Sequence, residues 1–338
     1  MVASNQQVSV SAVIALYNGE RHLIDAIESI LNQTQQVAEI LIVNDGSSDS
    51  SVEILNQYLN RNPRARKIVK LLEQDNNGQG SARNAGVKSA QGDLIGFLDQ
   101  DDTWEPTHVS EMVPFFADNP KLGWVYSDFN EFDDQNRFIR RQFLAKQEYI
   151  PPVNSVFGLI SQDLMMLPSA SLIRREAFLS VGGFDTQFRG YEDDDLFMRI
   201  FVAGWAYEYT PNALINYRIH PHNSSRNHSF PKSRIKFYRK YLSFFNPDSD
   251  YYPKFIHQHL APRMISAAIH DATVAARDKD FEGHQIAIDF LNEIFDDTGF
   301  NFRKKLVLKI AKRPTILKLA LNVRGYKNVF SSRKNVSY

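Results

Sequence analysis

Three aspartates that follow one apolar segment have the residue type and spacing of a divalent-metal site. Asp99, Asp101 and Asp102 stand directly after the run 94–98. Carboxylates this crowded repel one another unless a cation neutralises them. Their oxygens suit Mg²⁺ or Mn²⁺, ions that also bind phosphate oxygens. A polar turn in which Asp102 caps the next helix explains one aspartate but not three, so the pattern favours a metal site.

A second acidic cluster occupies residues 192–195, at the start of a segment with the apolar spacing of a helix. The helix dipole favours acids in a first turn, and this structural explanation stays open for Asp194 and Asp195. A carboxylate that is crowded by others and partly buried has a raised pKa, which suits a general base. The second cluster is therefore a candidate for accepting a proton.

Two further motifs carry weaker signals. Gly78 and Gly80 precede a predicted helix that contains Arg83, an arrangement that can cradle a phosphate or simply form a capped loop. A dinucleotide fingerprint is excluded, because the loop follows the third strand and Arg83 stands where the third glycine belongs. His220 and His222 could ligate a metal, although a single His-x-His pair is mostly a chance surface feature.

The first hundred residues alternate between strand and helix patterns, which predicts βαβ units in a doubly wound, mostly parallel α/β sheet. Ligands of such sheets lie beyond the carboxyl ends of the strands, so the chemistry is expected just after Leu16, Val43, Leu72 and Leu98. Strands are predicted at 8–16, 39–43, 67–72 and 94–98, and helices at 21–31, from Ser48 or Asp49 onward, and at 81–90.

The pattern changes twice further along the chain. Residues 104–228 mix a helix, several strands and aromatic loops, whereas helices are predicted at 235–245, 255–277 and 283–294. We therefore expect an α/β domain over 1–228 and a helical C-terminal region over 229–338, with a basic tail at 298–338.

Composition excludes several classes of protein. The chain has 338 residues, of which 43% are hydrophobic, so it can bury a substantial core. It has no cysteine, which rules out disulfides, thiolate zinc sites and cysteine nucleophiles. No run of 18 apolar residues occurs, and residues 1–7 lack the basic start of a signal peptide. We expect a cytoplasmic protein.

The net charge of zero hides a split between the body of the chain and its end. Residues 298–338 carry eleven basic and no acidic side chains, leaving 28 basic against 39 acidic residues before them. Lys305, Lys309 and Lys312 fall on one side of a helical projection, opposite Leu306 and Ile310, which favours contact with an anionic membrane surface. Packing on the acidic body is the alternative. No nucleic-acid module is visible, so no nucleic-acid partner is expected.

Taken in order, these motifs resemble the family-2 glycosyltransferases of GT-A fold, of the bacterial surface-polysaccharide type. The resemblance covers about 8–225, two thirds of the chain, and an ordered set is far more specific than any one motif. The matching runs are Tyr17-Asn18-Gly19-Glu20, Val43-Asn44-Asp45-Gly46-Ser47, Asn77-Gly78 to Arg83-Asn84, Leu98-Asp99-Gln100-Asp101-Asp102, Gly182-Gly183-Phe184-Asp185, Glu192-Asp193 and Arg218-Ile219-His220.

The resemblance implies a division of labour in the α/β domain, with a nucleotide-binding half over about 1–103 and an acceptor half over about 104–228. Asp45 would pair with the nucleotide base, with UDP as the expected nucleotide. The donor-binding residues would be Ala15, Leu16, Tyr17, Glu20, Asp45, Gly78, Arg83, Asp99 and Gln100.

The resemblance also implies which groups take part in the reaction. Asp101 would hold Mn²⁺ or Mg²⁺, with His220 completing the site and Asp99 facing either the metal or the donor. Asp193 would be the general base, with Glu192 beside it. The acceptor would meet Ser169, Ala170, Gly183 and Tyr191.

The expected reaction is an inverting transfer of a sugar from a nucleotide-diphosphate donor to a hydroxyl of a glycan or lipid-linked acceptor, on the inner face of the cell membrane. Two alternatives stay open: a nucleotidyltransferase, and a non-catalytic protein that binds sugar nucleotides.

Overall fold

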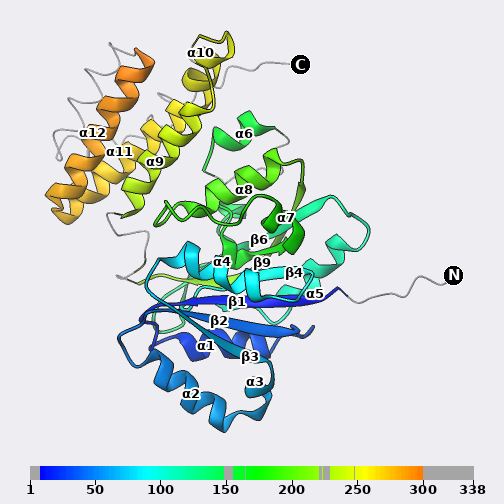
Figure 1. Cartoon of the computed structure of the whole chain (residues 1–338). Helices are drawn as coiled ribbons and strands as arrows, with labels where there is room; N and C mark the ends of the chain where they lie inside the picture. The colour runs from blue at the N-terminus through cyan, green and yellow to red at the C-terminus, as the bar shows by residue number, and fades with distance from the viewer. Residues whose placement is uncertain are drawn as a thin grey trace. The chain divides into compact units, whose positions relative to one another are not determined.

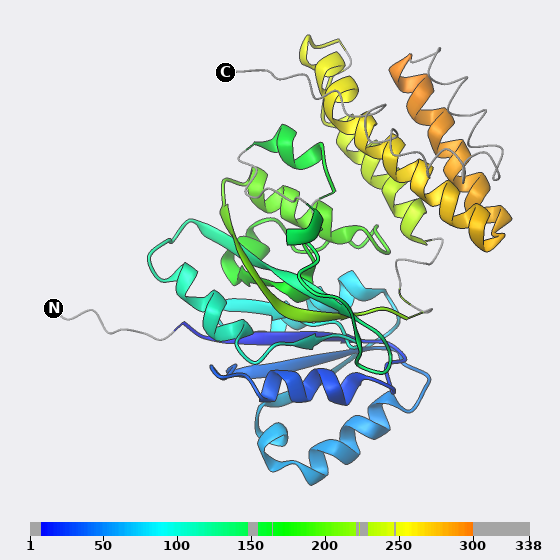
Figure 2. The ribbon, with the colours of Figure 1, turned by 180° about the vertical axis from the view of Figure 1, so that it is seen from behind.

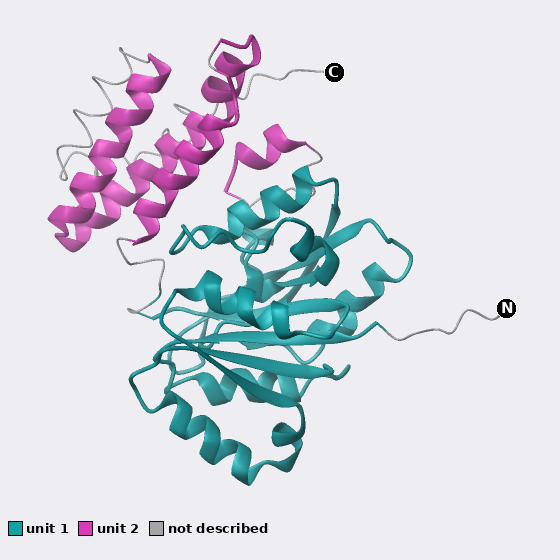
Figure 3. Ribbon diagram, viewed as in Figure 1, with its two compact units in different colours: residues 1–154, 164–223 teal, residues 155–163, 224–338 magenta. Residues whose placement is uncertain are grey.

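The computed structural model describes residues 8–147, 155–163, 165–220, 223, 229–246 and 248–299. The chain forms two compact units, one from 1–154 and 164–223 and the other from 155–163 and 224–338 (Figure 3). We expected residues 155–163 in the α/β domain, whereas they group with the second unit. Phe157 of that segment stacks on His259, with 4.9 Å between ring centroids, so the segment belongs to the helical unit.

The first unit is organised by four parallel strands in the order β3-β2-β1-β4 (Figure 1). They are β1 (Val10–Leu16), β2 (Glu39–Asp45), β3 (Val69–Gln74) and β4 (Leu94–Phe97). Every residue of β1, β2 and β4 is buried, as expected for strands whose two faces are both covered by helices.

Helices cover both faces of these strands. Figures 1 and 2 show α1 (Leu23–Leu31) and α2 (Ser51–Arg61) on one face and α4 (Gln79–Ser89) on the other. The strand order explains this change of face. The chain runs from β1 to β2 and β3 on one side and then returns to β4 on the other side of β1, and right-handed crossovers in opposite directions place their helices on opposite faces. The connections of β1 and β4 therefore lie on opposite faces of the sheet. The carboxyl ends of these two strands form a topological switch point, where ligands bind in this class of sheet.

One predicted strand begins later than expected. Residues 67–68 end a short helix, α3 (Pro63–Ile68), and β3 starts at Val69. Proline is preferred in the first turn of a helix, and Asn62 Oδ1 accepts a hydrogen bond from Ala65 N at 3.1 Å. This cap outweighs the β-branched residues that suggested a strand.

Beyond β4 the sheet becomes mixed. Strand β4 pairs antiparallel with β8, β8 pairs antiparallel with β6, and β6 pairs parallel with β9. Short β5 and β7 add to β9 and β6, giving one sheet of nine strands in the described chain. The strands are β5 (Thr103–Trp104), β6 (Leu122–Phe132), β7 (Phe138–Arg140), β8 (Ser171–Arg174) and β9 (Ala206–Arg218).

Between β4 and the end of β9 the helical segments are short, apart from α8. They are α5 (His108–Met112), α7 (Arg175–Ser180), α8 (Glu192–Val202) and the 3₁₀ turns η1 (Val113–Phe116), η2 (Ala145–Gln147) and η3 (Pro168–Ala170). The acidic residues 192–195 thus form the first turn of α8, as the sequence predicted.

The second unit is helical. Tyr238 donates to Asp297 at 2.9 Å, and Arg239 binds Glu293 through two nitrogens at 2.6 and 2.8 Å, so α9 is bound to α12. In the described residues, no helix combines the length and apolar character needed to cross a bilayer. The helices are α6 (Val156–Ile160), α9 (Ser229–Ser243), α10 (Tyr251–Phe255), η5 (Ile256–Leu260, a π-helix), α11 (Ala261–Asp278) and α12 (Phe281–Thr298).

We expect Gly86→Ala to destabilise the first unit. A Cβ at Gly86 in α4 would lie 2.4 Å from Val13 Cγ1 on β1. Overpacking a core costs about 1–3 kcal/mol, whereas alanine gains only about 1 kcal/mol over glycine in a helix. Urea unfolding should show a net loss of stability. In the double variant with Val13→Ala the two losses should be less than additive, and full additivity would contradict the clash.

Candidate active site

The loops that follow β1 and β2 are bound to each other at the carboxyl edge of the sheet. Asn18 Oδ1 accepts from Ser48 N at 2.8 Å, and Glu20 Oε2 accepts from Ser50 N at 3.0 Å. In return, Glu20 N donates to Asp49 Oδ2 at 3.1 Å. Glu20, predicted to line the donor site, therefore holds two loops in register.

Gln100 binds the end of β1 to the loop after β4. Its Oε1 accepts from Tyr17 N at 2.8 Å and its Nε2 donates to Tyr17 O at 3.0 Å. A Cβ at Gly19 would lie 2.5 Å from the same Oε1, so a larger residue there would displace the Gln100 side chain. Ala15 and Leu16 are buried behind this pair, and the Tyr17 ring is 46% exposed.

Asp45 shapes the glycine loop after β3. Its Oδ1 accepts from Asn77 N at 2.8 Å and from Gln74 Nε2 at 2.6 Å, and its Oδ2 accepts from Gly78 N at 2.8 Å. Gly78 has φ +91°, which glycine adopts without strain, and it begins α4. Asp45 thus positions the helix that carries Arg83, while its expected contact with a nucleotide base stays a prediction.

Arg83 joins the two acidic clusters. Its Nη2 donates to Asp99 Oδ1 and its Nη1 donates to Glu192 Oε1 at 3.2 Å, so one guanidinium binds an acid of each cluster, and Glu192 lies 109 positions after Arg83 in the chain. The residue is only 3% exposed, and its guanidinium lies 5.3 Å from the centre of the Phe184 ring. Gln79 also donates to Asp99 Oδ1, at 2.8 Å. The predicted donor contact Arg83 and the two acidic clusters therefore form one site.

Burial sets the protonation of the α8 carboxylates. Burial raises the pKa of Glu192, and Arg83 opposes that shift. Glu192 Oε2 is buried and has no hydrogen-bond partner in the described part of the chain. The pKa of Asp193 is raised well above its usual value by burial, then by Asp194 and Glu192. Asp193 Oδ1 accepts from Asp194 N at 2.9 Å, so the carboxyl is held at the start of α8.

Asp195 has a structural role. Its Oδ2 accepts from Arg199 Nε at 2.7 Å, and Arg199 also donates to Gly183 O at 2.7 Å. Gly183 lies in the turn that Arg199 fixes, where a Cβ would come within 2.5 Å of Asn84 Oδ1. Tyr191 is buried in the left-handed conformation, with φ +67°, directly before α8.

The other end of the site brings Asp101 to His220. Asp101 Oδ2 and His220 Nε2 lie 2.8 Å apart, and both side chains are partly exposed. The neighbouring Asp102 is buried, and its Oδ1 accepts from Arg218 N at 2.9 Å. Burial, followed by Asp101 and Asp99, raises the pKa of Asp102 well above its usual value.

These side chains fit a divalent ion through two ligands rather than three. Asp101 offers a carboxylate oxygen, a ligand that suits Mn²⁺ and Mg²⁺, and His220 offers an imidazole nitrogen, a ligand common at transition-metal sites. Asp99 Oδ1 is instead bound by Arg83 and Gln79. Within the described ranges, no three His, Asp or Glu side chains group as metal ligands. His222 lies outside those ranges.

The predicted acceptor residues on η3 lie directly behind Asp99. Ser169 Oγ accepts from Asp99 N at 3.1 Å, and Ser169 O accepts from Trp104 Nε1 at 2.9 Å. Ser169 and Ala170 are both buried. Ser169 therefore holds the loop after β4 in place, a role that the sequence did not indicate.

Two contributors to the site were missed in the sequence. Gln79 was read only as part of the glycine loop, and Arg218 only as a neighbour of His220. Arg218 is 1% exposed and donates through Nε to Asp101 O at 2.8 Å. The signal was its place two residues before His220, but its partner lies 117 positions earlier in the chain.

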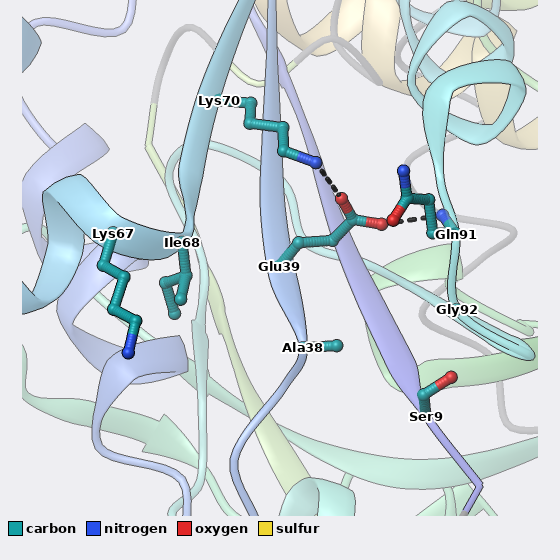
Figure 4. A pocket seen from close by; sticks show the side chains of 8 residues that line it. All are labelled: Ser9, Ala38, Glu39, Lys67, Ile68, Lys70, Gln91 and Gly92. Atoms are coloured by element: carbon teal, nitrogen blue, oxygen red, sulfur yellow. Dashed lines mark hydrogen bonds and ion pairs between the residues drawn. The ribbon is translucent and has the colours of Figure 1, made fainter.

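A separate pocket of about 370 Å³ lies at the opposite, amino-terminal edge of the parallel strands (Figure 4). At its wall, Glu39 accepts from Lys70 Nζ at 2.7 Å, Gln91 N at 2.7 Å and Ser11 Oγ at 2.8 Å. Because this carboxylate is fully bonded and the edge is the wrong one for ligands of a parallel sheet, the pocket does not compete with the site at Arg83.

Comparison with known families identifies the fold. A model of glycosyl transferase family 2 matches residues 11–182, just over half of the chain. The chain belongs to this family. A second model, described as the N-terminal domain of galactosyltransferase, matches residues 168–223. The predicted family, the family-2 glycosyltransferases, is thus confirmed.

Individual relatives agree with this assignment. Glycosyltransferase EpsJ of Bacillus subtilis, itself uncharacterized, is 26% identical over 94% of this chain and 96% of its own length. Chondroitin synthase of Escherichia coli is 29% identical over 64% of this chain but only 30% of its own length, and EpsH of Bacillus subtilis is 29% identical over 63% and 61%. The chain thus spans less than two thirds of the latter two relatives.

Solved structures confirm the GT-A fold. Residues 1–349 of Staphylococcus aureus TarS, in complex with UDP-GlcNAc, superpose with a TM-score of 0.62 at 14% identity, covering 97% of this chain and 94% of TarS 1–349. The mannosyltransferase PcManGT of Pyrobaculum calidifontis, in complex with GDP-Man and Mn²⁺, superposes with a TM-score of 0.58 at 13% identity, covering 96% and 89%.

We expect Arg83→Met to destabilise the first unit strongly. Removing one member of a buried ion pair leaves uncompensated charge and costs about 3–5 kcal/mol. Asp99 and Glu192 would both lose their partner. Adding Glu192→Gln should recover part of the loss in urea unfolding. A stability equal to that of the unaltered protein would show that Arg83 does not neutralise the two clusters.

Proposed function

We propose that the protein is an inverting glycosyltransferase that moves a sugar from a nucleotide-diphosphate donor to a hydroxyl of a glycan or lipid-linked acceptor. One observation carries the proposal: Arg83 binds Asp99 of the first acidic cluster and Glu192 of the second. Asp99, which is proposed to face the donor, and Glu192, which precedes the proposed base Asp193, therefore belong to the same site.

Asp101 and His220 are the proposed ligands of Mn²⁺ or Mg²⁺. When bound there, the ion supplies positive charge against the diphosphate of the leaving nucleotide. Asp99, whose Oδ1 is held by Arg83, is proposed to face the ribose or the sugar of the donor. The Mn²⁺ complex of PcManGT supports the choice of ion.

Asp193 is the proposed general base. The acceptor oxygen attacks the anomeric carbon as the bond to the diphosphate oxygen breaks on the opposite face, and the proton of the hydroxyl passes to the Asp193 carboxylate. A raised pKa makes this carboxylate a stronger base, and such assistance contributes about 10²–10⁴-fold in rate. A single displacement of this kind inverts the anomeric configuration.

The donor is proposed to be a UDP-sugar, and the product a surface polysaccharide. TarS, which has the same fold, is seen with UDP and with UDP-GlcNAc, and two relatives are named chondroitin synthase and hyaluronan synthase. Asp45, Tyr17 and Gln100 surround the carboxyl ends of β1 and β2, where the nucleotide is proposed to bind.

Asp193→Asn should abolish transfer while nucleotide binding stays close to that of the unaltered protein. Asparagine keeps an oxygen to accept from Asp194 N but cannot take up the proton. Nucleotide binding is measured by UDP-dependent thermal shift in Mn²⁺, and transfer by release of UDP from a panel of UDP-sugars with acceptor.

Asp194→Asn is the matched control, since it makes the same change at the neighbouring acid of α8. It should retain transfer. Substantial transfer by Asp193→Asn would remove Asp193 from the mechanism. Loss of both transfer and UDP binding in this variant would indicate a folding defect.

The basic tail, residues 298–338, is proposed to contact an anionic membrane on its inner face. Its eleven basic residues supply about 1 kcal/mol of attraction each when they lie near the lipid. Residues 300–338 lie outside the described chain, so this part of the proposal rests on the sequence alone.

Truncation after Gly299 is expected to abolish flotation with vesicles that contain phosphatidylglycerol. The cut falls just beyond α12, which ends at Thr298, and so keeps every described helix of the second unit. The full chain should float with these vesicles, lose binding in high salt, and ignore vesicles of phosphatidylcholine alone. Equal flotation of the full and truncated chains would refute membrane contact through the tail.

A further inference from the structure

Arg218, at the end of β9, connects three separate segments of the first unit. Its Nε donates to Asp101 O at 2.8 Å, and its Nη1 donates to Asn136 Oδ1 at 2.8 Å and to Asp133 O at 3.2 Å. Its Nη2 lies 3.6 Å from Asp25 Oδ2 on α1. The guanidinium is thus shared among the loop after β4, the turn between β6 and β7, and a helix.

The backbone of the same residue holds the neighbouring acid. Arg218 N donates to Asp102 Oδ1 at 2.9 Å, and the side chain lies 4.2 Å from the centre of the Phe132 ring. Phe132 is the partner of Arg218 in the parallel pairing of β6 with β9. Side chain, main chain and strand register therefore all place Arg218 against residues 101–102.

This position matters because Asp101 and His220 reach each other from different elements. His220 follows Arg218 by two residues, and its Nε2 lies 2.8 Å from Asp101 Oδ2. The main-chain carbonyl of Asp101 is held by the Arg218 side chain itself. Arg218 therefore links the main chain at Asp101 to the strand end that carries His220.

The turn 133–137 gives the guanidinium a rigid anchor. Asp133 Oδ1 accepts from Gln135 N at 2.9 Å and from Arg137 N at 3.0 Å. Asn136 has φ +58°, a left-handed conformation that asparagine tolerates better than most residues. Its amide oxygen is thereby presented to Arg218.

We propose that Arg218 is a positioning residue that, anchored on Asn136, holds Asp101 and His220 at the separation needed to bind a divalent ion. The inference rests on the proposed function for the identity of the two ligands. A lysine cannot replace it, since one ammonium cannot make the directed, planar set of bonds that a guanidinium makes.

The test is the affinity for Mn²⁺ of the full chain saturated with UDP, read from the electron paramagnetic resonance signal of free Mn²⁺. Loss of an outer-shell partner weakens metal binding by about 10- to 100-fold, and this is expected of Arg218→Lys. Asn136→Gly removes the anchor but allows φ +58°, and it should weaken Mn²⁺ binding less.

Two variants on the same hairpin serve as controls. Asn136→Asp keeps an acceptor for Arg218 and should restore Mn²⁺ affinity to that of the unaltered protein. Arg141→Gln removes a guanidinium that lies over Phe138, 3.6 Å from its ring centre, and should leave the affinity unchanged. Thermal melting of each variant separates metal binding from folding, because a purely structural role lowers the melting temperature without changing Mn²⁺ affinity.

The outcomes distinguish the two proposals. Should the unaltered protein with UDP bind no Mn²⁺, the metal site itself is refuted, and the role of Arg218 with it. If the unaltered protein binds Mn²⁺ and a folded Arg218→Lys binds it equally well, only the role of Arg218 is refuted. If Arg218→Lys does not fold, the comparison of Asn136→Gly with the unaltered protein decides. Equal Mn²⁺ affinity of these two proteins overturns the inference.

Discussion

A buried guanidinium shared by two carboxylates is the interaction on which the site depends. Arg83 is almost completely inaccessible, and its partners Asp99 and Glu192 come from the loop after β4 and the first turn of α8. Removing such charges from water costs several kcal/mol per ion unless each finds its partner. The α4 helix, the β4 loop and the α8 helix are therefore obliged to meet at one point.

The two halves of the sheet make different contributions to this point. The parallel strands β1 to β4 end at one edge, where Asp45 fixes the start of α4 and Gln100 fixes the end of β1. The mixed half returns β8 and β9 alongside them, and with these strands come Ser169, Arg218 and His220. The residues proposed for the donor side thus come from a regular pattern of βαβ units, and the groups around Asp101 come from strands that add to that sheet later in the chain.

Many residues of the site hold other residues rather than face a ligand. Asp195 fixes Arg199 and the turn at Gly183, Ser169 supports the backbone of Asp99, and Glu20 joins two loops. The sequence predicted functional contacts at Gly183 and Glu20 because they lie within the matched motifs, and at Ser169 because it precedes the Gly182-Gly183 motif. In the structure these residues hold the loops and the backbone around the proposed reacting groups.

The sequence by itself determined the class of fold, most of the strands and helices of the first hundred residues, and the two acidic clusters, because hydrophobic periodicity and local charge are properties of neighbouring residues. Tertiary structure alone decided that the clusters share Arg83, that Asp101 meets His220, and that residues 155–163 join the helical unit. These contacts join residues about a hundred positions apart. Their partners follow from strand order and from the burial of charge, neither of which is visible in the spacing of residues along the chain.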